Sequence, residues 1–534
     1  MKSNSLNFFL NSRRQKSAVV VIVLIVWSVF VWRAATTFGP QSGHTDFNSD
    51  GAIPVLMAND IRPITVFDTY YYGADRWGGW PLIVARLVNH ATGFRWSEVR
   101  LLTARTIWLF IGVLILALLN RRAALSVVLI GIVVLSLQYI LRLRLYDLGQ
   151  VYAWQITALL FGWFALRKWL ERRCLSDVRI TRLELVGYSV AVVVPSLLAT
   201  LSSPLSGPLL CFIAGVETLR LYAQKRTTVP RCLRYGLQSL GLILFSMLAE
   251  FLIRINFHRH GLKHYQQNFK TEVNLDWNYL FINLKIHLQS LINFSWWPLL
   301  VLTLAFVVAG LAVVLSQRLR KKWKADLGDD TSFAIIGAFG IALINFLLVV
   351  AVDHVRLSLY DNRYLTPTFF FGSIGGLLVV WRVFDFAFRE LNVADYAQPI
   401  FAAALLLLLT VAFPPYLDAS LYKLRKETAL TLAQKSPNAV LMGGYWETYV
   451  FAALQPTNML TPLPLEGYQV RMPWTIKRLH EAEEVIVEYK RNNLGGRETP
   501  PPQITQYGDS LRLVDPRWYE NSEYAFARYL KQPN

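Results

Sequence analysis

Charged residues are scarce in this chain, and apolar residues are abundant. Asp, Glu, Lys and Arg make up 17% of the 534 residues, against about 25% in an average soluble domain. Hydrophobic residues make up 54% of the chain. Because a single soluble core stops growing at roughly 250–300 residues, an apolar excess of this size indicates that lipid is the solvent for much of the chain.

Cysteine is nearly absent, and the common cofactor motifs are missing. The three cysteines are Cys174, Cys211 and Cys232, so the region after residue 415 can form neither a disulfide framework nor a cysteine metal site. The histidine spacing gives no metal motif, and the chain has no Gly-rich phosphate loop. The sequence therefore predicts no metal ligands and leaves the cofactor unknown, with a divalent cation still open.

Acidic residues are in deficit, and the deficit is unevenly distributed. The chain has 54 Lys and Arg against 35 Asp and Glu, a net charge of +19. From Tyr416 to Asn534 there are 14 basic and 13 acidic residues, a balance of +1, so the remaining +18 belongs to the hydrophobic part. This pattern argues against a nucleic-acid partner and fits basic loops beside anionic membrane lipid.

Long apolar runs dominate the first 415 residues. A spanning helix needs about 20 mostly apolar residues, and we identify about eleven such runs. They cover residues 17–36, 99–119, 123–141, 150–167, 183–201, 207–223, 235–255, 289–316, 332–352, 365–384 and 397–415. The predicted fold class is an α-helical polytopic membrane protein of about 11 transmembrane helices (residues 1–415), followed by a small C-terminal α/β soluble domain (residues 416–534).

Basic residues predict the orientation of these helices. They cluster at the N-terminus and in alternate loops, which is the pattern of cytoplasmic loops. The first apolar run is long for a signal peptide, and Arg33 replaces the small residues of a cleavage site, so we expect a retained anchor. The chain is therefore predicted to be a multi-pass protein of the cytoplasmic (inner) membrane, with a cytoplasmic N-terminus and a periplasmic or extracellular C-terminal domain.

Two outer loops, residues 37–98 and 256–287, carry most of the candidate substrate contacts. Residues 49–57 of the first loop are expected to form a short helix along the membrane surface. Interfacial anchoring of the aromatic residues and a solvated basic face for the histidines are the alternatives to a binding role. The candidate substrate-binding residues are Tyr72, Asp75, Arg76, Trp77, His258 and His260.

Carboxylates at the outer surface are candidates for acid/base chemistry. Asp50 lies just outside the first apolar run, where a carboxylate could take the proton of an acceptor hydroxyl or amine; its alternative role is to cap the following helix. Asp147 lies in the outer turn after the third run, at the same predicted membrane depth, and Asp46 is a further candidate.

Arginines near the same surface are candidate phosphate ligands. A guanidinium matches a phosphate because it offers two parallel N–H donors and a fixed charge. Snorkelling to the lipid headgroups is the alternative for each of them. The candidates are Arg142, Arg144, Arg356 and Arg363.

The C-terminal domain shows alternating strand and helix signals. Residues 438–443 and 484–489 are expected to form strands, and residues 445–454 and 475–482 are expected to form helices. A final strand and helix are expected after the prolines at 500–502.

Three short stretches resemble the GT-C superfamily of polytopic glycosyltransferases, which includes protein mannosyltransferases and aminoarabinose transferases. They are the acidic segment of residues 48–52, the stretch 361–367 (Asp-Asn-Arg-Tyr-Leu-Thr-Pro) and residues 442–447 at the start of the soluble domain. Many members have adjacent Asp-Glu residues where this chain has Asp50 followed by Gly51, so Asp46 or Asp147 would supply a second carboxylate.

The resemblance implies transfer of a hexosyl or pentosyl group from a polyprenyl-phosphate donor to a glycan, lipid or protein acceptor of the envelope. Arg363 would hold the lipid phosphate, Asp50 would deprotonate the acceptor, and one displacement would invert the anomeric carbon. A secondary transporter and a non-catalytic envelope assembly protein are the competing hypotheses. The transporter would predict inverted repeats, and none is evident in the sequence.

Overall fold

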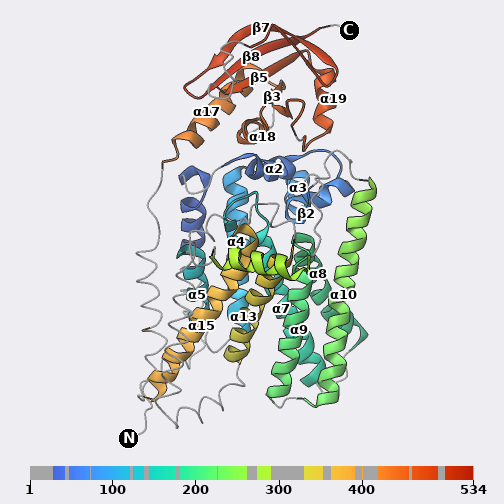
Figure 1. Ribbon diagram of the computed structural model, residues 1–534, viewed down its shortest axis with the longest axis vertical. Helices are drawn as coiled ribbons and strands as arrows, with labels where there is room; N and C mark the ends of the chain where they lie inside the picture. The colour runs from blue at the N-terminus through green and yellow to red at the C-terminus, as the bar shows by residue number, and fades with distance from the viewer. Residues whose placement is uncertain are drawn as a thin grey trace.

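The computed structural model shows a helical bundle with a sheet domain over one end (Figure 1). The described residues are 28–42, 47–71, 74–120, 124–137, 144–175, 181–224, 227–260, 274–289, 330–352, 362–390, 400, 418–455, 460–468, 470–490 and 500–532.

Eight long helices in the described part of the chain form the bundle, and each overlaps a predicted apolar run. They are α4 (Glu98–Leu119), α5 (Ala124–Leu137), α7 (Tyr152–Leu175), α8 (Arg182–Ser202), α9 (Ser206–Ala223), α10 (Val229–His260), α13 (Asp330–Ala351) and α15 (Thr366–Glu390). Within the described residues, α4, α8, α10, α13 and α15 are long and apolar enough to cross a membrane.

The total number of spanning helices stays a prediction. The first predicted run, 17–36, is described only from residue 28, and residues 28–37 are helical. Of the runs 289–316 and 397–415, only residues 289 and 400 are among the described residues. A further helix of the described chain covers residues 277–289, within the region expected to be an outer loop.

Small residues let the bundle helices approach closely. A Cβ added to Gly131 on α5 would lie 2.4 Å from Cγ1 of Val113 on α4. At Gly337 on α13, it would lie 2.3 Å from the ring of Trp163 on α7. Since lipid gives no hydrophobic drive for helix association, close van der Waals packing of this kind holds the helices together.

A buried ion network ties α7, α9 and α13 together near the end of the bundle opposite the sheet domain (Figure 1). Arg167 on α7 pairs with Glu217 on α9 at 2.8 Å. Arg220 on α9 pairs with Glu217 at 2.6 Å and with Asp330 on α13 at 3.1 Å. Trp163 also donates its indole N–H to Glu217 over 2.6 Å. Every buried charge of this network has a partner, which burial in a low-dielectric medium requires.

The first outer loop folds into short elements between the bundle and the sheet domain. They are η1 (Pro40–Ser42), α2 (Ser49–Asn59), η2 (Val66–Thr69), β1 (Tyr70–Tyr71), β2 (Ala74–Gly78) and α3 (Trp80–Thr92). Pro81 lies in the first turn of α3, and Gly93 ends this helix with a φ of 70°. Both are positions where those residues fit without strain.

In its described residues, the C-terminal domain has a six-stranded sheet and three helices. Its elements are α17 (Ser420–Lys435), β3 (Val440–Gly443), α18 (Tyr445–Leu454), β4 (Thr461–Pro464), α19 (Trp474–Glu481), β5 (Glu484–Lys490), β6 (Gln503–Gln506), β7 (Asp509–Glu520) and β8 (Tyr524–Lys531). The strand order is β4-β3-β5-β8-β7-β6, with β3 parallel to β4 and β5 and the other pairs antiparallel. Helices α17 and α18 pack on the face of the sheet toward the bundle (Figure 1), whereas α19 packs on the other face, where Leu479 meets Val485 and Val487 of β5.

One element of the predicted C-terminal domain is wrong. A helix was expected at the end of the chain, but residues 524–531 form β8, which pairs with β5 on one side and β7 on the other. Ala, Arg, Leu and Lys in this segment favour a helix by intrinsic propensity. The pairing with two neighbouring strands overrides that weak preference.

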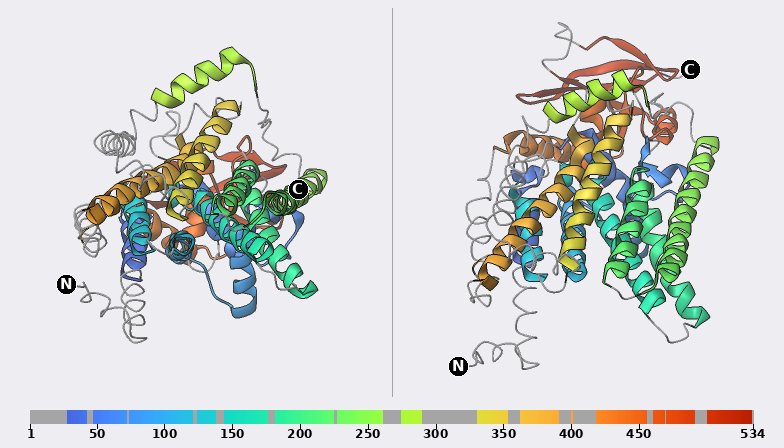
Figure 2. Two further views of the ribbon diagram at one scale, coloured as in Figure 1. Left: turned by 90° about the horizontal axis from the view of Figure 1, so that it is seen from below. Right: turned by 60° about the horizontal axis from the view of Figure 1, so that its bottom comes forward.

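The helix predicted at residues 49–57 is confirmed, and its setting differs from the expectation. Residues 51–59 are all buried, because α18 of the C-terminal domain packs on α2. The helix is therefore a layer between two parts of the protein, with the sheet domain over it in both side views (Figures 1 and 2).

Candidate functional site

Asp50 lies in the first turn of α2, and it does not cap the helix. The N-cap is Asn48, whose Oδ1 accepts a hydrogen bond from the backbone N–H of Gly51 over 3.1 Å. The carboxylate of Asp50 is thus not needed for capping and is half-buried. Its position near the positive end of the helix dipole favours its charged form.

Asp147 lies in a turn that a buried arginine holds in place. Arg105 on α4 donates to the carbonyl of Leu145 over 2.6 Å, to that of Leu148 over 3.2 Å and to that of Gln150. Within the turn, the N–H of Gly149 donates to Oδ1 of Asp147 over 2.8 Å. The backbone around Asp147 is therefore fixed both by the side chain of Arg105 and by the hydrogen bond within the turn.

The structure brings Asp50 and Asp147 together. Gly149 packs directly on Asp50, since a Cβ added to this glycine would lie 2.8 Å from Cβ of Asp50 and 2.8 Å from its carbonyl carbon. Burial raises the pKa of Asp147 above its ordinary value, and the nearby Asp50 adds to the rise. The hydrogen bond from Gly149 and the charges of Arg105 and Arg144 oppose it. The two carboxylates form a pair in which Asp147 has a stronger hold on its proton than an ordinary aspartate.

The C-terminal domain adds Arg471 to this carboxylate pair. Arg471 is buried and donates its backbone N–H to Oη of Tyr449 over 2.6 Å and its Nε–H to Oη of Tyr445 over 3.3 Å. Burial by itself would lower its pKa, but Tyr445, Asp50 and Tyr449 outweigh that effect, and the pKa is raised. The charge of Arg471 therefore acts on Asp50 from the side opposite the bundle.

Sequence reasoning missed Arg471. Tyr445 and Tyr449, on the predicted helix of residues 445–454, position this arginine. The sequence around Arg471 carries no periodic or motif signal of its own. Only the packing of α18 on α2 places it near Asp50.

The arginines predicted to hold phosphate occupy different places. Arg144 is half-buried in the turn that carries Asp147, and its charge reaches that carboxylate. Arg363 lies in η5 (Asn362–Leu365), directly before α15, where it donates to Oη of Tyr364 over 3.2 Å. Arg142 and Arg356 lie outside the described residues, as do Asp46 and Tyr72.

The remaining predicted substrate contacts lie on a short hairpin and at the end of α10. Asp75, Arg76 and Trp77 lie on β2, in the hairpin with β1. His258 is exposed near the end of α10, and His260 is the last residue of that helix. Among the described residues, no group of three or more His, Cys, Asp or Glu side chains could hold a metal ion.

A compact ion network shapes the loop between α2 and α3. Arg86 is buried and lies 3.2 Å from Asp68 and 3.6 Å from Asp60. Arg62 lies 2.5 Å from Asp60 and 3.6 Å from Asp68. Asp60 and Asp68 thus fix the position of Arg62 at the boundary with the C-terminal domain.

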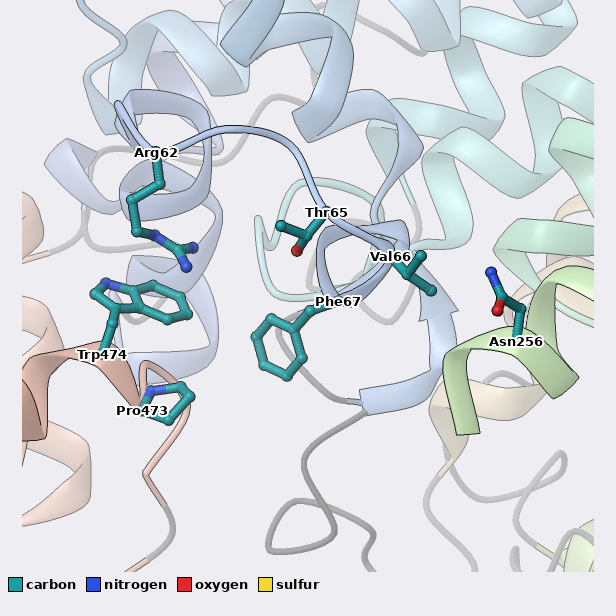
Figure 3. Close-up of a pocket in the computed structure, with 7 residues that line it drawn as sticks. All are labelled: Arg62, Thr65, Val66, Phe67, Asn256, Pro473 and Trp474. Carbon is teal, nitrogen blue, oxygen red and sulfur yellow. The ribbon is translucent and has the colours of Figure 1, made fainter. Parts of the chain in front are cut away.

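Two clefts open at this boundary, and Arg62 and Trp474 line both of them. One, of about 530 Å³, has Phe67, Asn256 and Pro473 among its other walls (Figure 3). The second, of about 520 Å³, lies between the loop after α2 and helix α19. The guanidinium carbon of Arg62 lies 3.0 Å from the ring centroid of Trp474, so the stacked pair separates the two clefts.

Comparison with solved structures identifies the fold as the GT-C fold, which confirms the resemblance drawn from the sequence at that level. The chain is similar to ArnT from Cupriavidus metallidurans bound to undecaprenyl phosphate, with a TM-score of 0.51, 13% identity, and coverage of 96% of this chain and 98% of that one. The apo structure of the same ArnT gives a TM-score of 0.47 with 11% identity and the same coverage.

The archaeal oligosaccharyltransferase AglB from Archaeoglobus fulgidus, in complex with an inhibitory peptide and a dolichol-phosphate, gives a TM-score of 0.37 with 12% identity, over 87% of this chain and 69% of that one. No protein-family model and no curated protein sequence matches the chain. At these identities the likeness shows the fold alone, so the activity has to be argued from the site.

Proposed function

We propose that this protein transfers a sugar from a polyprenyl-phosphate donor to an envelope acceptor on the outer face of the cytoplasmic membrane. The observation that carries the proposal is the meeting of Asp50 and Asp147 at the end of the bundle, beneath the C-terminal domain and beside Arg144 and Arg471. The fold supports it, because ArnT shares that fold and its structure holds undecaprenyl phosphate.

Asp50 is the general base in this mechanism. The helix N-terminus and Arg471 favour its anionic form, so it can accept the proton of the acceptor hydroxyl as the oxygen attacks the anomeric carbon. Asp147, whose pKa is raised, positions the acceptor or the sugar by hydrogen bonding. Environments that make the pKa values of two neighbouring carboxyl groups different in this way give the two groups different roles.

Guanidinium groups stabilise the leaving phosphate. Arg144 and Arg363, with Arg142 and Arg356 as the further candidates from the sequence, supply positive charge where the lipid phosphate departs, so no strong acid is needed. A single displacement inverts the anomeric carbon. The donor enters from the membrane side and the acceptor from the side of the C-terminal domain.

The test is sugar transfer in membranes from labelled polyprenyl-phosphate sugars, with the native chain and Asp50→Asn at matched expression. Transfer by Asp50→Asn is expected to fall by about 10²–10⁴-fold, the range for loss of a general base, while donor binding is retained. The matched control is Glu427→Gln, which neutralises an exposed carboxylate on α17 and should transfer at the native rate. Undiminished transfer by Asp50→Asn would remove Asp50 from the mechanism, and no transfer from any donor by the native chain would contradict the proposed function.

A further inference from the structure

The cleft between the loop after α2 and helix α19 has an excess of positive charge. Four basic and two acidic residues are among those that line it. Arg62 is neutralised by Asp60 and Asp68. Lys477 and Arg478 share one carboxylate, Glu481, at 3.8 and 3.5 Å, and exposed pairs of this kind are weak. Arg95 is exposed on the opposite wall of the cleft.

A fixed aromatic side chain lines the same cleft. The ring of Trp474 is held by Arg62, stacked on it at 3.0 Å, and by the edge of Phe67, with ring centroids 6.1 Å apart at 88°. Arg62 is in turn fixed by its two carboxylates. Indole presents both an apolar face and an N–H donor, which suits the mixed apolar and hydroxyl surface of a sugar ring.

One short segment connects the cleft with the carboxylate pair. Arg471, at one end of this segment, acts on Asp50, and Trp474, three residues later, lines the cleft. Leu56 on the cleft wall belongs to the same helix as Asp50, and their separation of six positions corresponds to about 9 Å of helix rise. A ligand in the cleft is therefore within one or two sugar units of the proposed reaction centre.

We propose that this cleft binds an acidic saccharide, which makes it the subsite for the non-reacting part of an anionic glycan acceptor. This role as an acceptor subsite rests on the proposed function, whereas the binding of an acidic saccharide does not. The basic residues at the rim attract the acid groups, and Trp474 contacts a ring face. The cleft opens between the loop and the soluble domain, so its ligand arrives from the aqueous side.

Calorimetric titration of the purified full-length protein in detergent tests the proposal without any donor. The probe is the hexamer of galacturonic acid, and maltohexaose is its neutral counterpart. The variant Arg95→Glu/Arg478→Glu reverses one exposed charge on each wall. The matched control is Arg512→Glu, an exposed residue of β7 that does not line the cleft.

We expect the native chain and Arg512→Glu to bind the acidic hexamer with equal affinity. The double variant should bind it at least about tenfold more weakly, which corresponds to a loss of about 1.4 kcal/mol of binding free energy or more. Maltohexaose should bind at least about tenfold more weakly than the acidic hexamer. Asp50→Asn should bind the hexamer as the native chain does, although its sugar transfer is expected to be reduced, so loss of the proposed function and loss of this site are told apart.

Four results would overturn the proposal. The first two are no binding of the acidic hexamer by the native chain and native-like binding by the double variant. The third is an equal loss of affinity in Arg512→Glu, which would indicate diffuse attraction to a basic surface. The fourth is displacement of the hexamer by equimolar inorganic phosphate, which would indicate a simple anion site. If the hexamer binds as expected but the native chain transfers no sugar from any donor, the cleft is retained and the transferase proposal fails.

Discussion

At the scale of single residues, the informative feature is a carboxyl group that the fold makes harder to ionise. Burial is the main reason that the pKa of Asp147 is raised from 3.8, and Asp50 adds to it. A carboxyl group with a raised folded-state pKa makes a stabilising contribution that is fully present below the unfolded-state pKa. This contribution is lost as the pH rises through the folded-state pKa.

The variant Asp147→Asn should therefore change the pH dependence of stability. The amide oxygen can still accept the hydrogen bond from Gly149, but the side chain cannot ionise. We expect the apparent Tm of the variant, relative to the native chain, to increase as the pH is raised from about 4 to 8. Thermal denaturation of both proteins in the same detergent measures this difference. A difference that does not change with pH would show that Asp147 titrates as an ordinary aspartate.

At the scale of elements, α2 is held between the turn at residues 144–150 and helix α18. Because Gly149 has no side chain, the turn can approach Asp50 so closely that a Cβ at this position would clash with it. Gly149 is not among the described glycines with a positive φ. Its role is therefore to leave space for this close approach, and not to provide an unusual backbone conformation. The position of the proposed base thus depends on the packing of three segments that are far apart in the sequence.

Gly149→Ala should displace Asp50 without changing any charged group. The new Cβ would lie 2.8 Å from two atoms of Asp50, so α2 or the turn must shift. A misplacement of about 1 Å can cost a catalytic group about 10²-fold in rate, and we expect sugar transfer to fall by about 10–100-fold with donor binding retained. Gly187→Ala on α8 is the matched control, since its Cβ would meet nothing within 4 Å. Equal transfer by both variants would contradict the close packing at Gly149.

Elements with a strong local signal were predictable, and elements that depend on partners were not. The helices of the bundle and α2 follow from apolar runs, and α18 and β5 follow from their periodicity. The strand β8 was mistaken for a helix because its two strand neighbours, rather than its own residues, decide its conformation. In the candidate site, membrane depth predicted that Asp147 lies near Asp50, but Arg471 reaches it only through the docking of a separate domain.

At the scale of the whole molecule, the position of the C-terminal domain defines which face of the membrane carries the site. The domain lies over α2, the helix that carries Asp50, at one end of the bundle (Figure 1). The basic loops predict that the opposite end is cytoplasmic, so the site and the domain should both face outward.

Labelling of single cysteines in intact cells tests this orientation. Lys477→Cys is an exposed position on α19, and Arg182→Cys is an exposed position at the start of α8, on the predicted cytoplasmic side. A membrane-impermeant maleimide should label the first in intact cells and the second only after the membrane is opened. The native Cys174 and Cys232 are buried and Cys211 is half-buried, so the native chain without an added cysteine measures the background labelling. The reverse pattern would invert the topology and move the proposed chemistry to the cytoplasm.

The ion network at the far end of the bundle has a consequence for motion during turnover. Removing one partner from a buried ion pair costs about 3–5 kcal/mol, and Glu217 and Arg220 connect α7, α9 and α13 through several such contacts. A rocking movement that separated these helices, as alternating access requires, would have to break the contacts in each cycle. The inner half of the bundle should therefore behave as a rigid foundation, and the movements that admit donor and release product should be confined to the outer loops and the domain above them.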